Sequence, residues 1–347
     1  MKQIVECVPN FSEGQDSNII DAIAASIDAV EGIKLLSVEP DKDYNRTVIT
    51  FVGEPNSVKE AAFQATKAAS ELIDMANHKG EHPRLGAVDV VPFIPVSGST
   101  MDDCVRLARE YGERVAVELN IPIYLYEEAA TKPDRKNLAT IRKGEYEGLP
   151  EKLRDPNWFP DFPIAGENQF NPKSGATVTG ARFFLIAYNV NLKTDDKNIA
   201  HEIALRIRES GRSMKNEKGE VVKDAFGKTV NIPGSLKSVK AMGVLLERFN
   251  IAQVSINLTN FNETPPHVAF EEVKKEAERL GVAVTGSEIV GLIPREALLA
   301  AGSYYLGDHI NNMNVSEMDL IHIAIQYLGL SQFEVFDPNK KIIEYML

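Results

Sequence analysis

The order of the predicted strands and helices is the same in the two halves of the chain, and this repeat most constrains the fold. In the first half, apolar strand-like runs and stripes of helical spacing follow one another as β-α-β-β-α-β over residues 3–96. A helix over residues 102–119 and a strand over residues 121–126 complete this half. The second half repeats the six-element order over residues 181–291. The pattern predicts an α+β protein with two ferredoxin-like (βαββαβ) units and a ligand cleft between them.

The two halves are joined by a long segment, residues 127–180, that is rich in Pro, Gly, Asn and Asp. Aromatic residues, among them the single tryptophan Trp158, are spaced through it. We therefore predict an ordered loop that lies on a surface. The domains expected are residues 1–180, including this connecting loop, and residues 181–347.

Composition excludes several classes of protein. With 38 Lys and Arg against 50 Asp and Glu, the net charge is −12, and a nucleic-acid partner needs a basic surface. No run approaches the roughly eighteen apolar residues of a membrane span, and the first residues do not resemble a secretory signal. Cys7 and Cys104 lie in apolar periodic segments, which predicts buried thiols. We expect a soluble, cytoplasmic enzyme.

The most informative polar stretch is HKGEHPRLG, directly before the apolar run AVDVVPFIPV. His78 and His82 stand four residues apart with Glu81 between them, which fits the zinc-protease pattern H-x-x-E-H. That pattern needs a continuous helix, and Gly80 and Pro83 both oppose one here. The other interpretations are a solvated loop without function and a catalytic loop in which a histidine takes and returns a proton near neutral pH.

Several motifs occur in one order along the whole chain. They are VECVPNFSEG, NRTVITFVG, HKGEHPRLGAVDVVPFIPV, IPIYLYEEAA, IRKGEYEGLPEKL, SGATVTGARFFLIAYNVNL, AQVSINL and IIEYML. Together they resemble the formiminotransferase family, the glutamate formimidoyltransferases. The resemblance implies two α/β subdomains with a folate-binding tunnel between them. In mammals this unit is fused to a cyclodeaminase domain, and because the chain ends at IIEYML we expect that second activity to be absent.

The resemblance also implies an activity. Family members transfer the formimino group from N-formimino-L-glutamate to tetrahydrofolate, giving 5-formiminotetrahydrofolate and L-glutamate in histidine degradation. The pterin nitrogen must lose a proton as it attacks the amidine carbon, and the departing glutamate nitrogen must gain one. One imidazole is able to do both in turn, and the family's catalytic histidine matches His82, with His78 as a neighbour. Tetrahydrofolate is thus the expected co-substrate, and no metal is expected.

A carboxylate beside His82 is expected to orient the imidazole and to raise its pKa above the usual value near 6.5. The family's functional aspartate matches Glu39, which keeps the charge but reaches one methylene further. Asp41 and Asp43, in the same acidic turn, are alternatives for this role.

Both substrates carry carboxylates, so cations are expected around them. Lys79 and Arg84 flank His82, and Arg182 ends the motif SGATVTGAR; the fork of an arginine suits bidentate carboxylate binding. Lys79 is equally well interpreted as an ordinary surface charge. Asn10 is a candidate polar contact or a turn asparagine. The loop over residues 158–175 resembles the family's folate-contacting segment, and the contacts predicted there are Asn168, Gln169, Lys173, Ser174 and Gly175.

Other functions stay open from the sequence. One alternative is a cycloligase-like enzyme, which has the same fold and also binds a folate but acts on 5-formyltetrahydrofolate. A non-catalytic folate-binding module binds reduced folate without turnover, with His82 only hydrogen-bonded to the pterin. A zinc hydrolase contains stoichiometric metal. The partners expected are small molecules, with neither nucleic acid nor a membrane, and the apolar strands of ferredoxin-like units are compatible with a homodimer.

Overall fold

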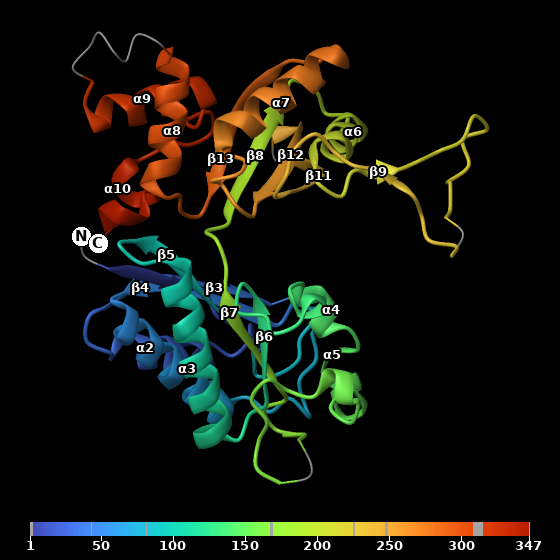
Figure 1. Ribbon diagram of the computed structural model, residues 1–347. Helices are drawn as coiled ribbons and strands as arrows, with labels where there is room; N and C mark the ends of the chain where they lie inside the picture. Colours follow the sequence, from blue (N-terminus) through green and yellow to red (C-terminus); the bar gives the residue numbers. More distant parts are fainter. Residues whose placement is uncertain are drawn as a thin grey trace. The chain divides into compact units, whose positions relative to one another are not determined.

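The computed structural model describes residues 3–42, 44–80, 82–166, 169–224, 226–246, 249–307 and 315–346. The chain divides into two units, residues 1–182 and 183–347, each with its own sheet and helices (Figure 1). The fold is mixed α+β, as the alternation of strand-like and helical segments predicts. Within the described ranges, no helix is both long enough and apolar enough to cross a membrane.

The first unit is built on a seven-stranded sheet. Its strands are β1 (Ile4–Cys7), β2 (Asn10–Phe11), β3 (Ile33–Asp41), β4 (Arg46–Gly53), β5 (Val88–Ser97), β6 (Ile123–Glu127) and β7 (Thr177–Ala181). β4 pairs antiparallel with β3 on one side and with β1 and β2 on the other. β1 and β2 also pair antiparallel with β5, which continues through the parallel strand β7 to β6. The order across the sheet is therefore β3, β4, β1 with β2, β5, β7, β6.

Three helices cover one face of this sheet (Figure 1). They are α1 (Ser17–Asp28), α2 (Pro55–Leu72) and α3 (Met101–Leu119). Two of them begin at side chains that cap the helix: Asp16 accepts from the Asn18 N–H, and Thr100 and Asp103 form a capping box. Their apolar stripes pack with alternate residues of the strands into one core that also buries both cysteines. The predicted helices and the buried thiols are confirmed.

The opposite face of this sheet is partly covered by the segment after β6. That segment contains α4 (Leu138–Arg142), α5 (Glu145–Lys152) and two 3₁₀ turns, Pro133–Arg135 and Pro156–Trp158. Leu149 and Leu153 pack with Tyr124 and Tyr126 of β6, and Trp158 lies edge-on to Tyr124 with ring centroids 6.5 Å apart. The segment is an ordered cover, as predicted, but it includes helices where only a loop was expected.

β7 is a strand that the sequence analysis did not predict. Residues 177–180 belong to the stretch interpreted as a loop, and the strand predicted from residue 181 begins only at Ile186. The run TVT is β-branched, which favours extended backbone, and pairing with β5 and β6 on its two sides buries it. The prediction was wrong because the surrounding glycines and prolines are typical of loops.

The second unit contains a four-stranded antiparallel sheet in the order β11, β12, β8, β13. Its strands are β8 (Ile186–Leu192), β11 (Val239–Leu246), β12 (Ile251–Leu258) and β13 (Val284–Val290). Two helices, α6 (Lys197–Ile207) and α7 (Pro266–Arg279), pack against each other and against the sheet. The chain order β-α-β-β-α-β predicted for this half is confirmed.

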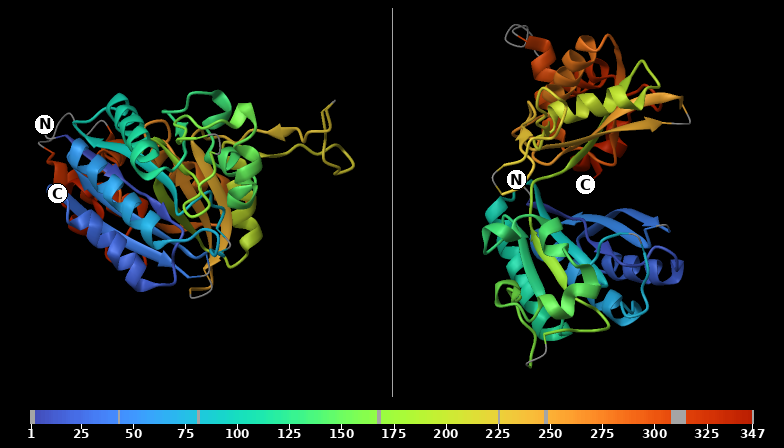
Figure 2. Two further views of the ribbon diagram at one scale, coloured as in Figure 1. Left: turned by 90° about the horizontal axis from the view of Figure 1, so that it is seen from below. Right: turned by 90° about the vertical axis from the view of Figure 1, so that its right-hand side faces the viewer.

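Two additions extend the second unit. Between α6 and β11, a polar hairpin forms an arm whose base is the antiparallel pair β9 (Arg212–Ser213) and β10 (Asn231–Ile232). The arm extends away from the rest of its unit in Figure 1 and in the left view of Figure 2. After β13, α8 (Arg295–Leu306) and α9 (Glu317–Leu328) pack against each other, and α10 (Pro338–Lys341) follows.

Candidate functional site

The loop that carries His78 and His82 connects α2 to β5. Its described residues, 73–80 and 82–87, contain no helix, as predicted from the glycine and the proline within the motif. The two imidazoles therefore do not share one helical face. Across the described part of the chain, no group of three or more His, Cys, Asp or Glu side chains is arranged to hold a metal ion. The two histidines have different hydrogen-bond partners: Arg46 for His82, and Arg84 with the Asn45 carbonyl for His78.

His82 lies among polar side chains on the sheet face opposite the three helices. Phe11 belongs to the helix-side core, so Asn10 and its cross-strand partner Val48 face the other way, as does Arg46 two residues earlier on β4. Nη1 of Arg46 lies 3.4 Å from Nε2 of His82 and 3.4 Å from Oδ1 of Asn10. Because a guanidinium only donates hydrogen bonds, the contact with His82 requires an unprotonated Nε2.

Three guanidinium groups act on His82. Burial lowers the pKa of His82 most, and the charges of Arg142, Arg46 and Arg84 lower it further, from 6.5 to about 4, while Asp41 opposes them. The expectation that a carboxylate brings this pKa above 6.5 is therefore wrong. Burial and three positive charges outweigh one carboxylate, and near neutral pH the imidazole is uncharged and able to accept a proton.

The carboxylate whose charge acts on His82 is Asp41. Asp41 stands directly opposite Arg46 in the pairing of β3 with β4, at the end of the hairpin next to its turn. Glu39 stands two residues earlier on β3 and is exposed. Asp43 lies outside the described residues. The position of Asp41 favours it among the alternatives, and the catalytic role of Glu39 stays a prediction.

Arg142 reaches the site from the end of α4. Its guanidinium makes an ion pair with Asp89, a buried carboxylate at the start of β5 that also accepts from the Leu85 N–H at 2.9 Å. Burial raises the pKa of Asp89, and the charge of Arg142 opposes that shift. The sequence analysis missed both residues, although a carboxylate inside the apolar run AVDVVPFIPV indicates a paired buried charge.

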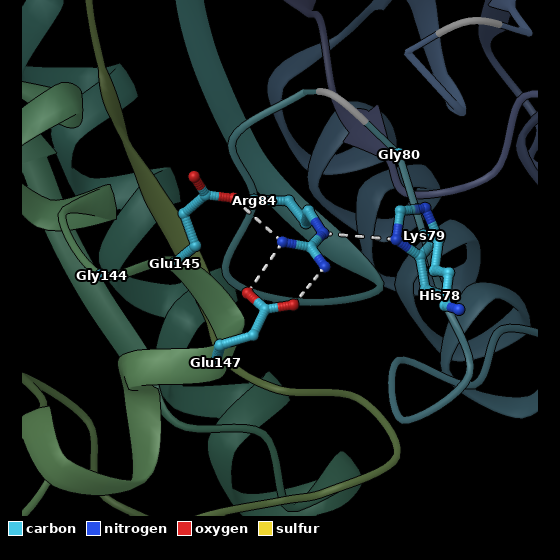
Figure 3. Close-up of a pocket in the computed structure, with 7 residues that line it drawn as sticks. All are labelled: His78, Lys79, Gly80, Arg84, Gly144, Glu145 and Glu147. Carbon is cyan, nitrogen blue, oxygen red and sulfur yellow. Dashed lines mark hydrogen bonds and ion pairs between the residues drawn. The ribbon is translucent and has the colours of Figure 1, made fainter.

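Arg84 is buried, and its guanidinium has partners inside the protein. It contacts Glu145 and Glu147 of α5 on one side and His78 on the other (Figure 3). Substrate binding by Arg84 stays a prediction, and Lys79 is exposed beside it. An open pocket of about 410 Å³ is lined here by His78, Lys79, Gly80, Arg84, Gly144, Glu145 and Glu147.

The predicted folate-contacting loop is anchored within the first unit. The Gln169 amide is buried and bonds backbone groups of its own loop, and Nζ of Lys173 donates to a carbonyl at the end of α2 at 2.7 Å. Ser174 is buried, and its carbonyl accepts an N–H just before β5. Gly175 adopts a φ of 67°. Asn168 lies outside the described residues, and the folate contacts of this loop stay predictions.

Arg182, the last residue of the first unit, follows β7. Its backbone N–H donates to the carbonyl of Phe93 at 3.2 Å, and its side chain hydrogen-bonds Tyr126. It also acts on Glu6, which is 4% exposed: burial raises the pKa of Glu6 to about 7, and the charge of Arg182 opposes this rise. Substrate binding by Arg182 stays a prediction.

The second unit has a polar row on its sheet that the sequence analysis did not identify. The Gln253 amide donates to Asn191 at 2.6 Å and to Glu288 at 2.9 Å, and Asn189 donates to the same Glu288 oxygen at 3.0 Å. These residues alternate with buried apolar side chains such as Val190. The alternation of polar and apolar residues in YNVNL and AQVSINL is the signal that indicates such a face.

An uncharged imidazole among arginines, on the polar face of a sheet, suits an enzyme that transfers protons beside an anionic small molecule. Two models of a known protein family match the chain. The model described as Formiminotransferase domain, N-terminal subdomain, matches residues 4–182, and the model described as Formiminotransferase domain matches residues 187–347. The chain therefore belongs to the formiminotransferase family.

Named relatives are similar over most of the chain. Formimidoyltransferase-cyclodeaminase of Dictyostelium discoideum is 50% identical over 347 residues, which cover 100% of this chain and 61% of that protein. Glutamate formimidoyltransferase of Streptococcus pyogenes is 47% identical over 88% of this chain and 94% of its own length. The protein of the same name from Thermoplasma acidophilum is 46% identical over 87% and 92%. This chain thus spans about three fifths of the longer relatives that it matches.

Proposed function

We propose that this chain transfers the formimino group from N-formimino-L-glutamate to tetrahydrofolate, giving 5-formiminotetrahydrofolate and L-glutamate, a step of histidine degradation. Membership of the formiminotransferase family supports the proposal, as do the two relatives of similar length that carry the name Glutamate formimidoyltransferase. The assignment of this activity to a site rests on His82, an uncharged imidazole whose Nε2 atom lies 3.4 Å from Nη1 of Arg46.

In the proposed reaction, neutral His82 moves one proton twice. The ring nitrogen of tetrahydrofolate attacks the amidine carbon of the formimino group and forms a C–N bond, and His82 takes the proton that this nitrogen loses. When the tetrahedral intermediate collapses, the bond from carbon to the glutamate nitrogen breaks, and His82 returns the proton to that nitrogen. An imidazolium of lowered pKa is a strong proton donor, which favours the second step.

The carboxylates of both substrates fit the arginines around His82. Arg46 is the best placed to receive one, because its Nη1 already lies 3.4 Å from the imidazole. A bound carboxylate would screen the positive charges, so we expect the pKa of His82 to rise when substrate binds. Lys79 and Arg182 stay proposed substrate contacts, together with the loop that ends at Gly175.

The proposal also includes the topology of the two units, the oligomeric state and the cellular location. The strand orders β3, β4, β1, β5 and β11, β12, β8, β13 support two ferredoxin-like units. A folate tunnel between the units, a homodimer, a cytoplasmic location and a reaction without a metal stay predictions from the sequence and the family resemblance.

An assay with two substrates tests the proposed function. The purified protein is incubated with tetrahydrofolate and N-formimino-L-glutamate, and separately with 5-formyltetrahydrofolate and ATP. We expect equal amounts of L-glutamate and 5-formiminotetrahydrofolate in the first reaction and no turnover in the second. Turnover of the formyl substrate alone would indicate a cycloligase-like enzyme, and folate binding without either turnover would indicate a binding module. Either result would overturn the proposal.

A further inference from the structure

The Arg84 guanidinium is the centre of a network of charges that the proposed proton transfer does not use directly. Arg84 is 6% exposed. Its Nη2 lies 2.6 Å from Oε1 of Glu147 and its Nη1 lies 3.0 Å from Oε2 of the same carboxylate, a two-pronged contact. Nη1 also lies 2.9 Å from Glu145, and Nε donates to Nδ1 of His78 at 3.3 Å. Figure 3 shows the guanidinium between the two carboxylates and the imidazole, so one side chain joins α5 to the His82 loop.

This contact fixes the hydrogen position on His78. An arginine guanidinium only donates hydrogen bonds, so Nδ1 of His78 must accept this one and carries no hydrogen. Nε2 of His78, 3.1 Å from the carbonyl oxygen of Asn45, must then carry the hydrogen, because a carbonyl only accepts. Burial lowers the pKa of His78, in agreement with an uncharged ring. His78 is therefore a bridge of fixed orientation between Arg84 and the turn after β3.

Hydrogen bonds to backbone carbonyls hold the chain on both sides of His82. Before it, the side-chain amide of Asn45 donates to the Lys79 carbonyl at 2.8 Å. After it, the backbone N–H of Tyr146 in α5 donates to the Arg84 carbonyl at 2.8 Å. Because His82 is two residues from Arg84, a displacement of Arg84 moves the imidazole relative to the sheet face.

We propose that Glu147 and Glu145, acting through Arg84 and His78, are positioning residues that hold His82 in place for proton transfer. The inference rests on the proposed formimino transfer and gives a role in it to residues of α5. A two-pronged carboxylate–guanidinium pair fixes the orientation of both groups, which a single point contact does not. A displacement of about 1 Å at a catalytic group typically costs on the order of 10²-fold in rate. The competing explanation is that the pair only anchors α5.

Kinetics of charge-removing variants test the proposal. Glu147→Gln keeps the shape of the side chain and removes its charge, and Glu151→Gln is the matched control, because Glu151 is exposed on the same helix. We expect Glu147→Gln to lower kcat about tenfold while KM for both substrates changes less than about twofold. The acid limb of kcat/KM should also move to lower pH, since a less neutralised Arg84 disfavours protonated His82.

Two further variants separate orientation from charge. Arg84→Lys keeps the charge but lacks the fork that contacts Glu147 and His78 together, so we expect a loss of kcat similar to that of Glu147→Gln. Glu147→Asp keeps the carboxylate and should recover part of the lost kcat. Glu151→Gln should match the wild type in kcat, KM and pH profile.

A measurement that does not depend on turnover separates this inference from the proposed function. ¹⁵N NMR of the labelled protein reports the hydrogen position on His78 and the titration midpoint of His82. We expect Nε2–H on His78 in the wild type, and a lower His82 midpoint in Glu147→Gln. Those NMR results without formimino transfer by the wild type would overturn the function and leave the positioning network standing.

Two results would overturn the network itself. One is a Glu147→Gln variant with wild-type kcat, pH profile and NMR titration. The other is a loss of activity that matches the loss of folded protein in thermal unfolding, with the pH profile unchanged. In both cases the contacts of Arg84 with α5 would only stabilise the fold.

Discussion

The charge of Arg46 is expected to help keep His82 uncharged, and Arg46→Gln tests this. Nη1 of Arg46 lies 3.4 Å from Nε2 of His82. Two like unit charges about 4 Å apart repel by about 1 kcal/mol in water and by about 4 kcal/mol at an effective dielectric constant of about 20. His82 is only half-buried, so we use the lower value, which corresponds to about 0.7 pH unit. Since burial and the other two arginines remain, we expect the pKa of His82 to rise from about 4 to about 5 and no further.

An NMR titration of the histidine side chains in the free protein measures this shift. The His82→Gln variant assigns the resonance of His82. Lys79→Gln is the control, because it removes an exposed positive charge three residues away and should leave the midpoint at its wild-type value. The reasoning is refuted if wild-type His82 titrates at 6.5 or above, or if Arg46→Gln leaves its midpoint unchanged.

The same charges set the pH dependence of the proposed reaction. With a pKa of about 4, only about one His82 in a thousand is protonated at pH 7, so the free enzyme holds the proton-accepting form. The acid limb of kcat/KM, which reports the free enzyme, should therefore lie near pH 4. The acid limb of kcat, which reports the complex, should lie at higher pH, because bound substrate carboxylates screen the arginines.

Three other predictions concern the histidine pair, a buried carboxylate and a glycine. His78→Ala should lower kcat by about tenfold at most, far less than His82→Ala, and a chelator should have no effect on the steady-state rate; equal losses or inactivation by chelator would indicate a metal site. Burial raises the pKa of Glu6 from 4.5 to about 7. Glu6 therefore lowers the free energy of unfolding as the pH rises from 4.5 to about 7. Glu6→Gln should thus be more stable than the wild type at pH 8, relative to pH 4, by on the order of 1–3 kcal/mol in denaturant unfolding; parallel pH profiles would contradict this. Gly175→Ala should lower the free energy of unfolding by about 1–3 kcal/mol in the same assay, because φ is 67° there and a Cβ would stand 2.2 Å from the Leu85 carbonyl oxygen; an unchanged midpoint would be inconsistent with this geometry.

Elements with a long periodic pattern were predictable from the sequence. The helix from Pro55 and the helix observed over Met101–Leu119 have apolar stripes over four or more turns, and their burial follows from that spacing. The strand β7 was missed because its five residues, one of them Gly180, carry too little periodicity. Its place between β5 and β6 results from pairing with distant segments, which a local pattern does not reveal.

The centre of the candidate site was predictable, but its surroundings were not. His82 stands in a motif that a single stretch of sequence displays. Arg46 and Arg142 come from two other segments and act on His82 only through the pairing of β4 with its neighbours and the packing of α4, where Arg142 pairs with Asp89. The direction of the pKa shift on His82 depends on these neighbours, so the carboxylates visible nearby in the sequence gave the wrong sign.

The central claim is that His82 carries the proton in formimino transfer. The most direct measurement is kcat of His82→Ala with N-formimino-L-glutamate and tetrahydrofolate, together with the Kd of tetrahydrofolate for the variant. We predict a kcat lower by ~10²-fold or more, with Kd within a factor of about two of the wild-type value, because proton transfer acts mainly in the transition state. A His82→Ala variant with wild-type kcat at saturating substrates would contradict the claim.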